Sequence, residues 1–357
     1  MRVREDARWA LVAPTSMGVR ITPEGSEAVH VAHRFTMQVT SAETNVASIS
    51  AYLGLPVLVL TNFVAGSPIS AMIKASLRER GMSFRGPDLP QGGPWGRRHQ
   101  FNIADTGSGV RAPRVWNDRA GEVGRELCAD DFDFDEIFGN QGVKILHLSG
   151  LIAALSPQTS RFCVGLARTA KKYGTVVSMD LNYRASFWEG REAELREAFQ
   201  EIASVSEILI GNEEDFQLCL GIPGPKAGGQ GLGAQIDSFS QMIQTIGTLY
   251  PQACFIATTL REVISANRHL WGMVVYGDDD FHVAPPREID VLDRIGGGDA
   301  SVGGILYALL RGWNAEQAMQ FGWAAGALAA ATPTDYLLPA DESQVWSAWE
   351  GNARVQR

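Results

Sequence analysis

The sequence predicts an α/β fold, with a mostly parallel central sheet flanked by helices and a second, smaller β-sheet. Short apolar or β-branched runs alternate with longer amphipathic segments, which is the pattern of parallel strands covered by helices. Several amphipathic segments begin at residues typical of helix N-termini. Residues 19–39 and 96–116 depart from this alternation and have the pattern of β-hairpins. The two hairpins therefore predict a sheet apart from the main one.

The main sheet is expected to contain short, apolar strands. They are Trp9–Ala13, Pro56–Leu60, Lys144–Leu148, Thr175–Met179, Glu207–Ile210, Cys254–Thr258 and Gly272–Tyr276. Helix starts between them are marked by capping residues. Ser67-Pro68 and Ser156-Pro157 each place an N-cap hydroxyl before a proline at the first helical position, where the missing N–H costs nothing. Asn314 precedes Gln317 by three residues, a capping-box arrangement that opens an Ala-rich helix.

The two hairpins come from separate parts of the chain. Residues 19–39 alternate polar and apolar side chains around Pro23-Glu24-Gly25, and residues 96–116 do so around Thr106-Gly107-Ser108-Gly109. We expect them to form one small sheet that covers a site at the edge of the main sheet, the alternative being an extension of the main sheet itself. The expected division is a β-lid of residues 18–40 and 96–118, and an α/β domain of residues 1–17, 41–95 and 119–357.

Composition excludes several classes of protein. The 357 residues are 45% hydrophobic and 20% charged, as in ordinary globular proteins. The 31 Lys and Arg against 40 Asp and Glu give a net charge of −9, with no basic block to bind nucleic acid. Four scattered cysteines, which form no C-x-x-C pair, predict reduced thiols rather than a zinc site or a disulfide framework.

No segment has the pattern of a secretory signal or a membrane span. Met1–Trp9 is charged and lacks an apolar stretch, and the uncharged run Gln317–Thr334 contains polar residues and a proline. We therefore expect a cytoplasmic protein with no membrane partner, in which the uncharged run forms a buried helix.

One segment has the composition of an anion-binding helix start. Gly296, Gly297 and Gly298 precede a helical pattern, so their backbone N–H groups are unobstructed where the helix dipole favours negative charge. Asp299 falls in the first turn, where the same dipole is expected to hold its pKa down so that it accepts a proton from a nearby hydroxyl. The alternative is a flexible loop capped by an aspartate. A Walker-type phosphate loop is excluded because no lysine follows a glycine.

The glycine segment resembles a known family signature. Residues 293–304 are similar to the D-x-x-G-A-G-D motif of the ribokinase (PfkB-type) carbohydrate kinases, with Gly297 in place of the alanine. Further blocks occur in family order between about residues 19 and 340, and they are most similar to the 2-keto-3-deoxygluconate kinase branch. These blocks are Asp118-Arg119-Ala120, Asp180–Arg184 with Phe187-Trp188, Gly211–Asp215 and Thr258–Glu262.

The resemblance implies a ribokinase-like fold and ATP-dependent phosphorylation of a primary hydroxyl, most simply of 2-keto-3-deoxygluconate to its 6-phosphate. Asp299 would take the hydroxyl proton, and Gly296, Gly297 and Gly298 would hold the transferring oxygens. The remaining cofactor residues implied are Asn212 and Asp215, which would order magnesium-bound water with no direct metal ligand, and Thr259, Arg261 and Asp293 on the nucleotide side. A requirement for a monovalent cation stays open.

The same resemblance implies the acceptor residues. Arg184 would grip a carboxylate with its two-pronged guanidinium, the alternative being a structural ion pair, and Arg119 from the lid would add a contact, the alternative being a solvated side chain. Asn45, Ser41 and Asn117 would complete the acceptor site. The Gly- and Ala-rich helix Phe321–Ala331 would lie beside the adenine, although its periodicity alone indicates core. Pairing of two chains through the lid is expected.

Three departures from the family pattern affect the acceptor side. Thr15-Ser16 stands where the family has Gly-Glu, Thr40-Ser41 where it has Gly-Gly, and Asn117 where the branch has tyrosine. Hydroxyl-bearing residues in place of glycines reshape a pocket or stiffen a hinge. A kinase for a neutral sugar or nucleoside, or a weakly active binding relative, therefore remains as an alternative.

Overall fold

The computed structural model describes residues 3–225, 231 and 235–352. Within this part of the chain, nine strands form the main sheet in the order β15-β14-β13-β12-β11-β10-β1-β4-β6. Pairing is parallel from β6 across to β13 and antiparallel from β13 to β15. The strands are β1 (Trp9–Pro14), β4 (Val57–Leu60), β6 (Met82–Arg85), β10 (Val143–Ser149), β11 (Val176–Asp180), β12 (Ile208–Ile210), β13 (Phe255–Ser265), β14 (Arg268–Gly277) and β15 (Asp280–Asp290).

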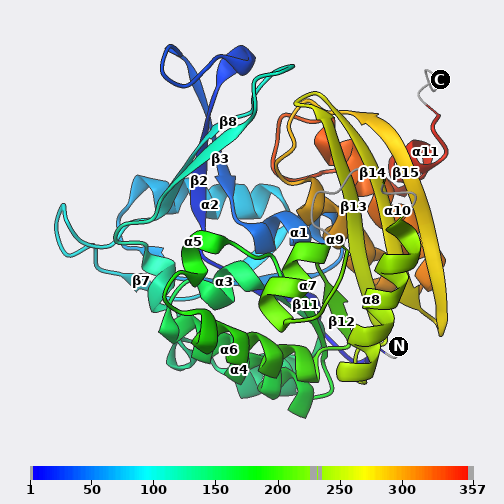
Figure 1. The fold of residues 1–357 in the computed structure, drawn as a ribbon. Helices are drawn as coiled ribbons and strands as arrows, with labels where there is room; N and C mark the ends of the chain where they lie inside the picture. The colour runs from blue at the N-terminus through cyan, green and yellow to red at the C-terminus, as the bar shows by residue number, and fades with distance from the viewer. Residues whose placement is uncertain (1–2, 226–230, 232–234, 353–357) are drawn as a thin grey trace.

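Helices cover both faces of this sheet (Figure 1). One face packs on α1 (Ala42–Tyr52), α2 (Pro68–Glu79), α9 (Gly297–Leu310), α10 (Ala315–Ala330) and α11 (Glu342–Trp349). The other packs on α3 (Gly150–Ala154), α4 (Pro157–Lys172), α6 (Glu192–Val205), α7 (Glu213–Leu220) and α8 (Ile236–Leu249). Successive strand residues alternate between the two cores, Val57 and Val59 facing one while Leu58 and Leu60 face the other. Continuous apolar runs therefore mark these strands.

The predicted helix starts are confirmed. The hydroxyl of Ser67 accepts from the backbone N–H of Ile69, and Ser156 forms a capping box with Thr159. Asn314 caps α10 in a capping box with Gln317. The uncharged run makes up most of α10, which is largely buried.

The edges of the main sheet differ from the sequence prediction. The strands expected at 254–258 and 272–276 are longer, and β15 and β6 were not predicted. β15 is an edge strand whose side chains are mostly half-buried or exposed, and it contains Pro285-Pro286, so it lacks the apolar pattern of the inner strands.

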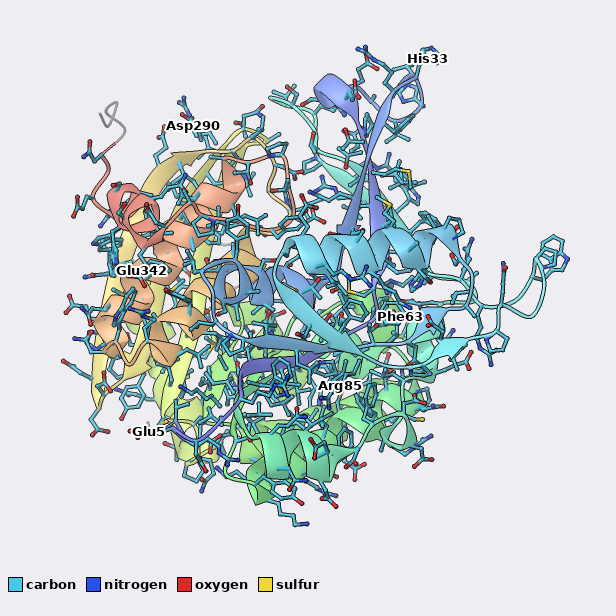
Figure 2. All side chains as sticks on the ribbon, turned by 180° about the vertical axis from the view of Figure 1, so that it is seen from behind. Glu5, His33, Phe63, Arg85, Asp290 and Glu342 are labelled. Carbon is cyan, nitrogen blue, oxygen red and sulfur yellow. The ribbon has the colours of Figure 1, made fainter. Side chains whose placement is uncertain are left out.

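A second, four-stranded sheet stands apart from the main one, in the order β3-β2-β8-β9. It is built from β2 (Gly18–Pro23), β3 (Phe35–Thr40), β8 (Gln100–Asp105) and β9 (Arg114–Asp118), which are the two predicted hairpins joined through parallel pairing of β2 with β8. Figure 1 shows it projecting from the body, and Figure 2 shows His33 at its far end. The prediction of a separate small sheet is confirmed, and the alternative of an edge extension is wrong.

Short elements complete the fold. They are the strands β5 (Phe63–Val64) and β7 (Asp88–Leu89), the helix α5 (Ala185–Trp188), the 3-10 turns η1 (Glu24–Ser26), η2 (Val123–Glu126) and η3 (Ala129–Asp131), and the π-helical segment η4 (Asp135–Gln141).

The four cysteines are free thiols. Among the helices of the described residues, none combines the length and the apolar character needed to span a membrane.

Candidate active site

The carboxyl ends of the parallel strands bring polar residues together at one edge of the main sheet. Thr15 follows β1, Ser149 ends β10, Asp180 ends β11 and Asn212 follows β12. In an open parallel sheet this edge is where ligands bind. The small sheet and the first turn of α9 border the same edge.

The glycine segment opens α9 in the predicted way. Gly296 is the N-cap with φ 86°, a left-handed conformation, and a Cβ there would overlap the carbonyl oxygen of Asp335. Only glycine fits this position without strain. A Cβ on Gly298 would meet nothing within 4 Å, so the space beside this residue of the first turn is open. A 14-residue helix with an open, glycine-lined start has the donors and the dipole to bind an anion.

Asp299 lies in the first turn of α9, where Nδ2 of Asn45 donates a 2.8 Å hydrogen bond to its Oδ2. Burial nevertheless raises the pKa of Asp299 to about 7, although the Asn45 hydrogen bond and the charge of Arg184 lower it. The expectation of a depressed pKa is therefore wrong. The helix start favours the carboxylate, but desolvation together with the nearby charges of Asp335 and Glu43 outweighs it.

Two further carboxyl groups share this edge. Burial raises the pKa of Asp215 to about 6 and that of Asp180 well above its ordinary value, and the charges of Asp215 and Asp299 add to the effect on Asp180. Arg184 is exposed at the start of α5, and its Nη1 donates to the carbonyl of Tyr183 at 2.7 Å. Its charge lowers the pKa of all three carboxyl groups.

Asn212 and Asp215 form the capping box of α7. The backbone N–H of Asp215 donates to Oδ1 of Asn212 at 2.8 Å, and that of Asn212 donates to Oδ2 of Asp215 at 2.9 Å. The other oxygen of Asp215 accepts from the backbone N–H of Tyr183 at 3.0 Å. Backbone donors therefore occupy both oxygens of Asp215, which suits a contact with a metal through water better than direct ligation. No group of three or more metal-ligating side chains occurs in the described part of the chain.

The other residues expected on the nucleotide side are spread out. Thr259 and Arg261 lie on one face of β13, beyond the point where its pairing with β12 ends. Asp293 is buried and forms an ion pair with Arg20, while its second oxygen accepts from the N–H of Ile295 at 3.0 Å. Both oxygens of Asp293 are thus engaged inside the protein.

On the acceptor side, Arg119 is held by a neighbouring carboxylate. Its Nη1 forms a 2.7 Å ion pair with Oε1 of the buried Glu122, which also accepts from the hydroxyl of Ser16 at 2.5 Å. The guanidinium lies 5.1 Å above the ring of Phe187. Because the side chain of Arg119 is only 15% exposed, it is not a solvated surface residue. Nε of Arg119 and Oε2 of Glu122 are buried without a partner, which leaves polar atoms at this position for a ligand.

The predicted residues on α1 and the lid have different surroundings. Ser41 is the N-cap of α1, and its hydroxyl contacts Thr44 and the sulfur of Met17. Asn117 is exposed on β9, directly opposite Asn102 of β8. Register places both on the face of the small sheet that carries Arg20.

The sequence analysis missed several residues of this region. Asn102, whose Oδ1 is buried without a partner, could have been found from its alternation in the hairpin. Glu43 accepts from the hydroxyl of Thr15 at 2.5 Å, and Arg20 also pairs with Asp335. Nothing in the local sequence signals these contacts, because their partners are distant in the chain.

A comparison with protein-family models decides the family. The model of the pfkB family carbohydrate kinases matches residues 129–340, more than half of the chain and including the glycine segment. The chain belongs to the pfkB family of carbohydrate kinases. It is therefore a kinase, as the glycine motif and the associated blocks predicted.

Curated relatives of this pfkB kinase are named as sugar kinases. The 2-dehydro-3-deoxygalactonokinase of Haloferax volcanii is 28% identical over 315 residues, covering 87% of each chain. A 5-dehydro-2-deoxygluconokinase of Clostridium perfringens is 28% identical over 214 residues, covering 60% of this chain and 56% of its own length.

Solved structures confirm the ribokinase-like fold. The 2-dehydro-3-deoxygluconokinase of Thermotoga maritima superposes with a TM-score of 0.84 at 24% identity, covering 96% of this chain and 98% of its own. A structure named as ribokinase II of Escherichia coli, in complex with ATP and Mg²⁺, has a TM-score of 0.75 at 15% identity, covering 96% and 99%.

Proposed function

We propose that this kinase transfers the γ-phosphoryl group of ATP to a primary hydroxyl of a sugar acid, with 2-keto-3-deoxygluconate as the first candidate and its 6-phosphate as the product. One observation carries the proposal. A carboxyl group with a pKa near 7, Asp299, stands at an open glycine-lined helix start, with the charge of Arg184 acting on it from a neighbouring strand end. The names of the curated relatives, which are dehydro-deoxy sugar kinases, support the same acceptor class.

The residues at this edge of the sheet are suited to bind a nucleoside triphosphate. The open space at Gly298 leaves the N–H groups of α9 free to bind phosphate oxygens. Three carboxyl groups at the same edge favour the binding of a cation, and Mg²⁺ bound to the nucleotide would be that cation. Asn212 and Asp215 would hold water molecules that coordinate the Mg²⁺. Thr259 and Arg261 of β13 would face the nucleotide. Phe321, by contrast, stacks within a cluster of aromatic rings, so the start of the helix segment 321–331 serves the core.

The proposed roles of the chain follow from these positions. Asp299 accepts the proton of the attacking hydroxyl, which a group with a pKa of about 7 does readily at neutral pH. Gly297 and Gly298 present N–H groups to the charge that develops on the transferring oxygens. Arg184 binds the acceptor carboxylate through two donors. Asn45 orients Asp299 rather than the acceptor.

The small sheet would act as the lid. Its inner face, with Asn102 and Asn117, would close over the acceptor, in keeping with a lid of residues 18–40 and 96–118 and an α/β domain formed by the rest. The opposite face exposes Phe35, Met37 and Trp116, each between 39% and 51% exposed, in register across the strands. An apolar face of this kind fits a second copy of the chain.

A second candidate acceptor is a neutral sugar. The observation in its favour is the ion pair of Arg119 with Glu122, which neutralises one of the two cations expected to bind a carboxylate. In that case the unpartnered atoms of the pair would bind hydroxyl groups.

The test is ATP-dependent turnover against a panel of keto-deoxy acids, hexoses and nucleosides. We expect kcat/KM for a keto-deoxy acid to exceed that for every neutral acceptor by at least ~10-fold, as one charged contact provides. A neutral sugar as the best acceptor would establish the second candidate, and absence of turnover with every member would indicate a binding relative.

A further inference from the structure

Arg20 and Arg80 are the largest fully buried side chains in the described part of the chain, and 2% of the surface of Arg20 is exposed. Arg20 belongs to β2 of the small sheet, yet its guanidinium forms ion pairs with two carboxylates of the main domain. They are Asp293, 273 positions away in the sequence, and Asp335, 315 positions away. A buried cation between two buried carboxylates is stable only while all three groups stay in place, because any unpaired charge would be costly.

The ion pairs of Arg20 connect it to the glycine turn at the start of α9. The second oxygen of Asp293 accepts from the N–H of Ile295 at 3.0 Å, directly before Gly296. The carbonyl of Asp335 packs so closely against Gly296 that no Cβ fits between them. Arg20 thus ties together the two segments that enclose the left-handed turn at the start of α9.

The ion pair of Arg20 with Asp335 also connects it, through hydrogen bonds, to the carboxyl group of Asp299. The hydroxyl of Thr40 donates to Oδ2 of Asp335 at 2.8 Å and accepts from Nδ2 of Asn45 at 3.3 Å. The same Nδ2 donates to Oδ2 of Asp299 at 2.8 Å. With both carboxyl groups ionised, the single hydrogen of the Thr40 hydroxyl is donated to Asp335, and the two amide hydrogens of Asn45 are donated to Thr40 and Asp299.

We propose that Arg20 is a positioning residue for phosphoryl transfer, which acts through Asp335, Thr40 and Asn45 on the carboxyl group of Asp299 and through Asp293 on the glycine turn. The inference rests on the proposed function, in which Asp299 is the base. The lid strand β2, the base and the phosphate-binding turn then form one connected unit.

Removal of Arg20 should also change the protonation of Asp299, through the charge of Asp335. The groups that act on Asp299 are the carboxylates of Asp335 and Glu43, the guanidinium of Arg184 and the amide of Asn45, and Asp180 lies close enough to interact with it. Without Arg20, the negative charge of Asp335 is no longer balanced. The pKa of Asp299 then rises further, and the acidic limb of the pH–rate profile moves to higher pH.

The experiment compares Arg20→Lys and Arg20→Ala in the full chain, with kcat, both KM values, the pH profile and Tm as readouts. Lysine retains the charge but has a single nitrogen for two carboxylates, so we expect kcat to fall by about 10-fold, and by at least ~100-fold for alanine. For Arg20→Ala, the acidic limb of the pH–rate profile should shift to higher pH. Guanidinium added to the buffer should restore part of the kcat of this variant. The control is Arg111→Ala, which removes another lid ion pair, with Asp105, and should leave kcat unchanged.

Thr40→Val tests the relay without changing charge, with Thr36→Val, an exposed threonine on the same strand, as its control. We expect a loss of about 10-fold in kcat for Thr40→Val only, and less than additive loss when it is combined with Arg20→Ala. Folded Arg20→Lys and Thr40→Val variants with wild-type kcat and an unshifted pH profile would overturn the inference. If the Arg20 variants do not fold, the kcat of Thr40→Val decides alone. A wild-type chain that phosphorylates no acceptor refutes the proposed function instead.

Discussion

Nδ2 of Asn45 lies 2.8 Å from Oδ2 of Asp299, so a side chain of α1 holds the carboxyl group in the first turn of α9. The contact joins residues 254 positions apart. The hydrogen bond sets the orientation of the group that we propose as the base. It lowers the pKa of that group, but burial raises the pKa by more, so the net shift is upward.

Asp299→Asn should reduce kcat by at least ~100-fold with little change in the KM for ATP, because the amide keeps the shape of the side chain and cannot accept the proton. Steady-state kinetics and a nucleotide-binding titration provide the check. As a control, Asp341→Asn changes a carboxyl group that caps α11 far along the chain, and its kcat should equal that of the wild type. A fully active Asp299→Asn enzyme would refute the assignment of the base.

The pKa of about 7 at Asp299 predicts opposite pH dependences for activity and stability. Activity should rise as pH increases through 7, because the ionised form accepts the proton. A carboxyl group whose pKa is raised on folding stabilises the protein below its unfolded pKa of about 4, and this stabilisation is lost as pH rises through 7. Asp299→Asn should therefore increase Tm by at least ~2 °C at pH 8 and leave it nearly unchanged at pH 4. Equal effects of the substitution at both pH values would contradict the raised pKa.

Gly298→Val should fold and lose activity. A Cβ at this position meets no protein atom within 4 Å and would occupy the space where we expect the phosphate oxygens. We expect kcat/KM for ATP to fall by about 100-fold, the size of effect seen when a stabilising donor is blocked. Gly165→Val in α4 is the matched control, since a Cβ there also meets nothing within 4 Å, and it should retain full activity. Comparable kinetics of the two variants would show that the turn at Gly298 binds no phosphate.

Arg184→Lys should weaken binding of an acidic acceptor, because a point charge replaces a two-pronged contact. The expected loss is on the order of 2 kcal/mol, or roughly 30-fold in kcat/KM, with little change in the KM for ATP. Saturation curves for an acidic and a neutral acceptor measure the difference. Arg196→Lys, an exposed change on α6, serves as the control. An equal loss on both acceptors would assign Arg184 to the fold rather than to the substrate.

Glu122→Gln should free the charge of Arg119, whose ion pair with Glu122 spans 2.7 Å. The amide keeps the shape and can still accept from Ser16, but it no longer neutralises the guanidinium. We therefore expect the ratio of kcat/KM for an acidic over a neutral acceptor to rise by about 5-fold, from a gain of ~1 kcal/mol in charge interaction. Competition between the two acceptors in one assay measures this ratio directly. A ratio that stays constant would place Arg119 outside the acceptor site.

Much of the fold could be predicted because its signals are local. The caps at Ser67, Ser156 and Asn314 act over two or three residues, and strand alternation acts over four to eight, so both are visible in a short window. β15 could not be predicted because it has no such local signal. It is an edge strand, stabilised by pairing with β14 rather than by a buried apolar pattern of its own.

The sequence by itself determined the order of the elements, the separate small sheet, the glycine-lined start of α9 and, through its motifs, the kinase family. Only the tertiary structure decided the raised pKa of Asp299 and the burial of Arg20 between Asp293 and Asp335. Local backbone geometry depends on neighbours in the chain, whereas desolvation and ion pairing depend on segments hundreds of residues apart that meet only when the chain has folded.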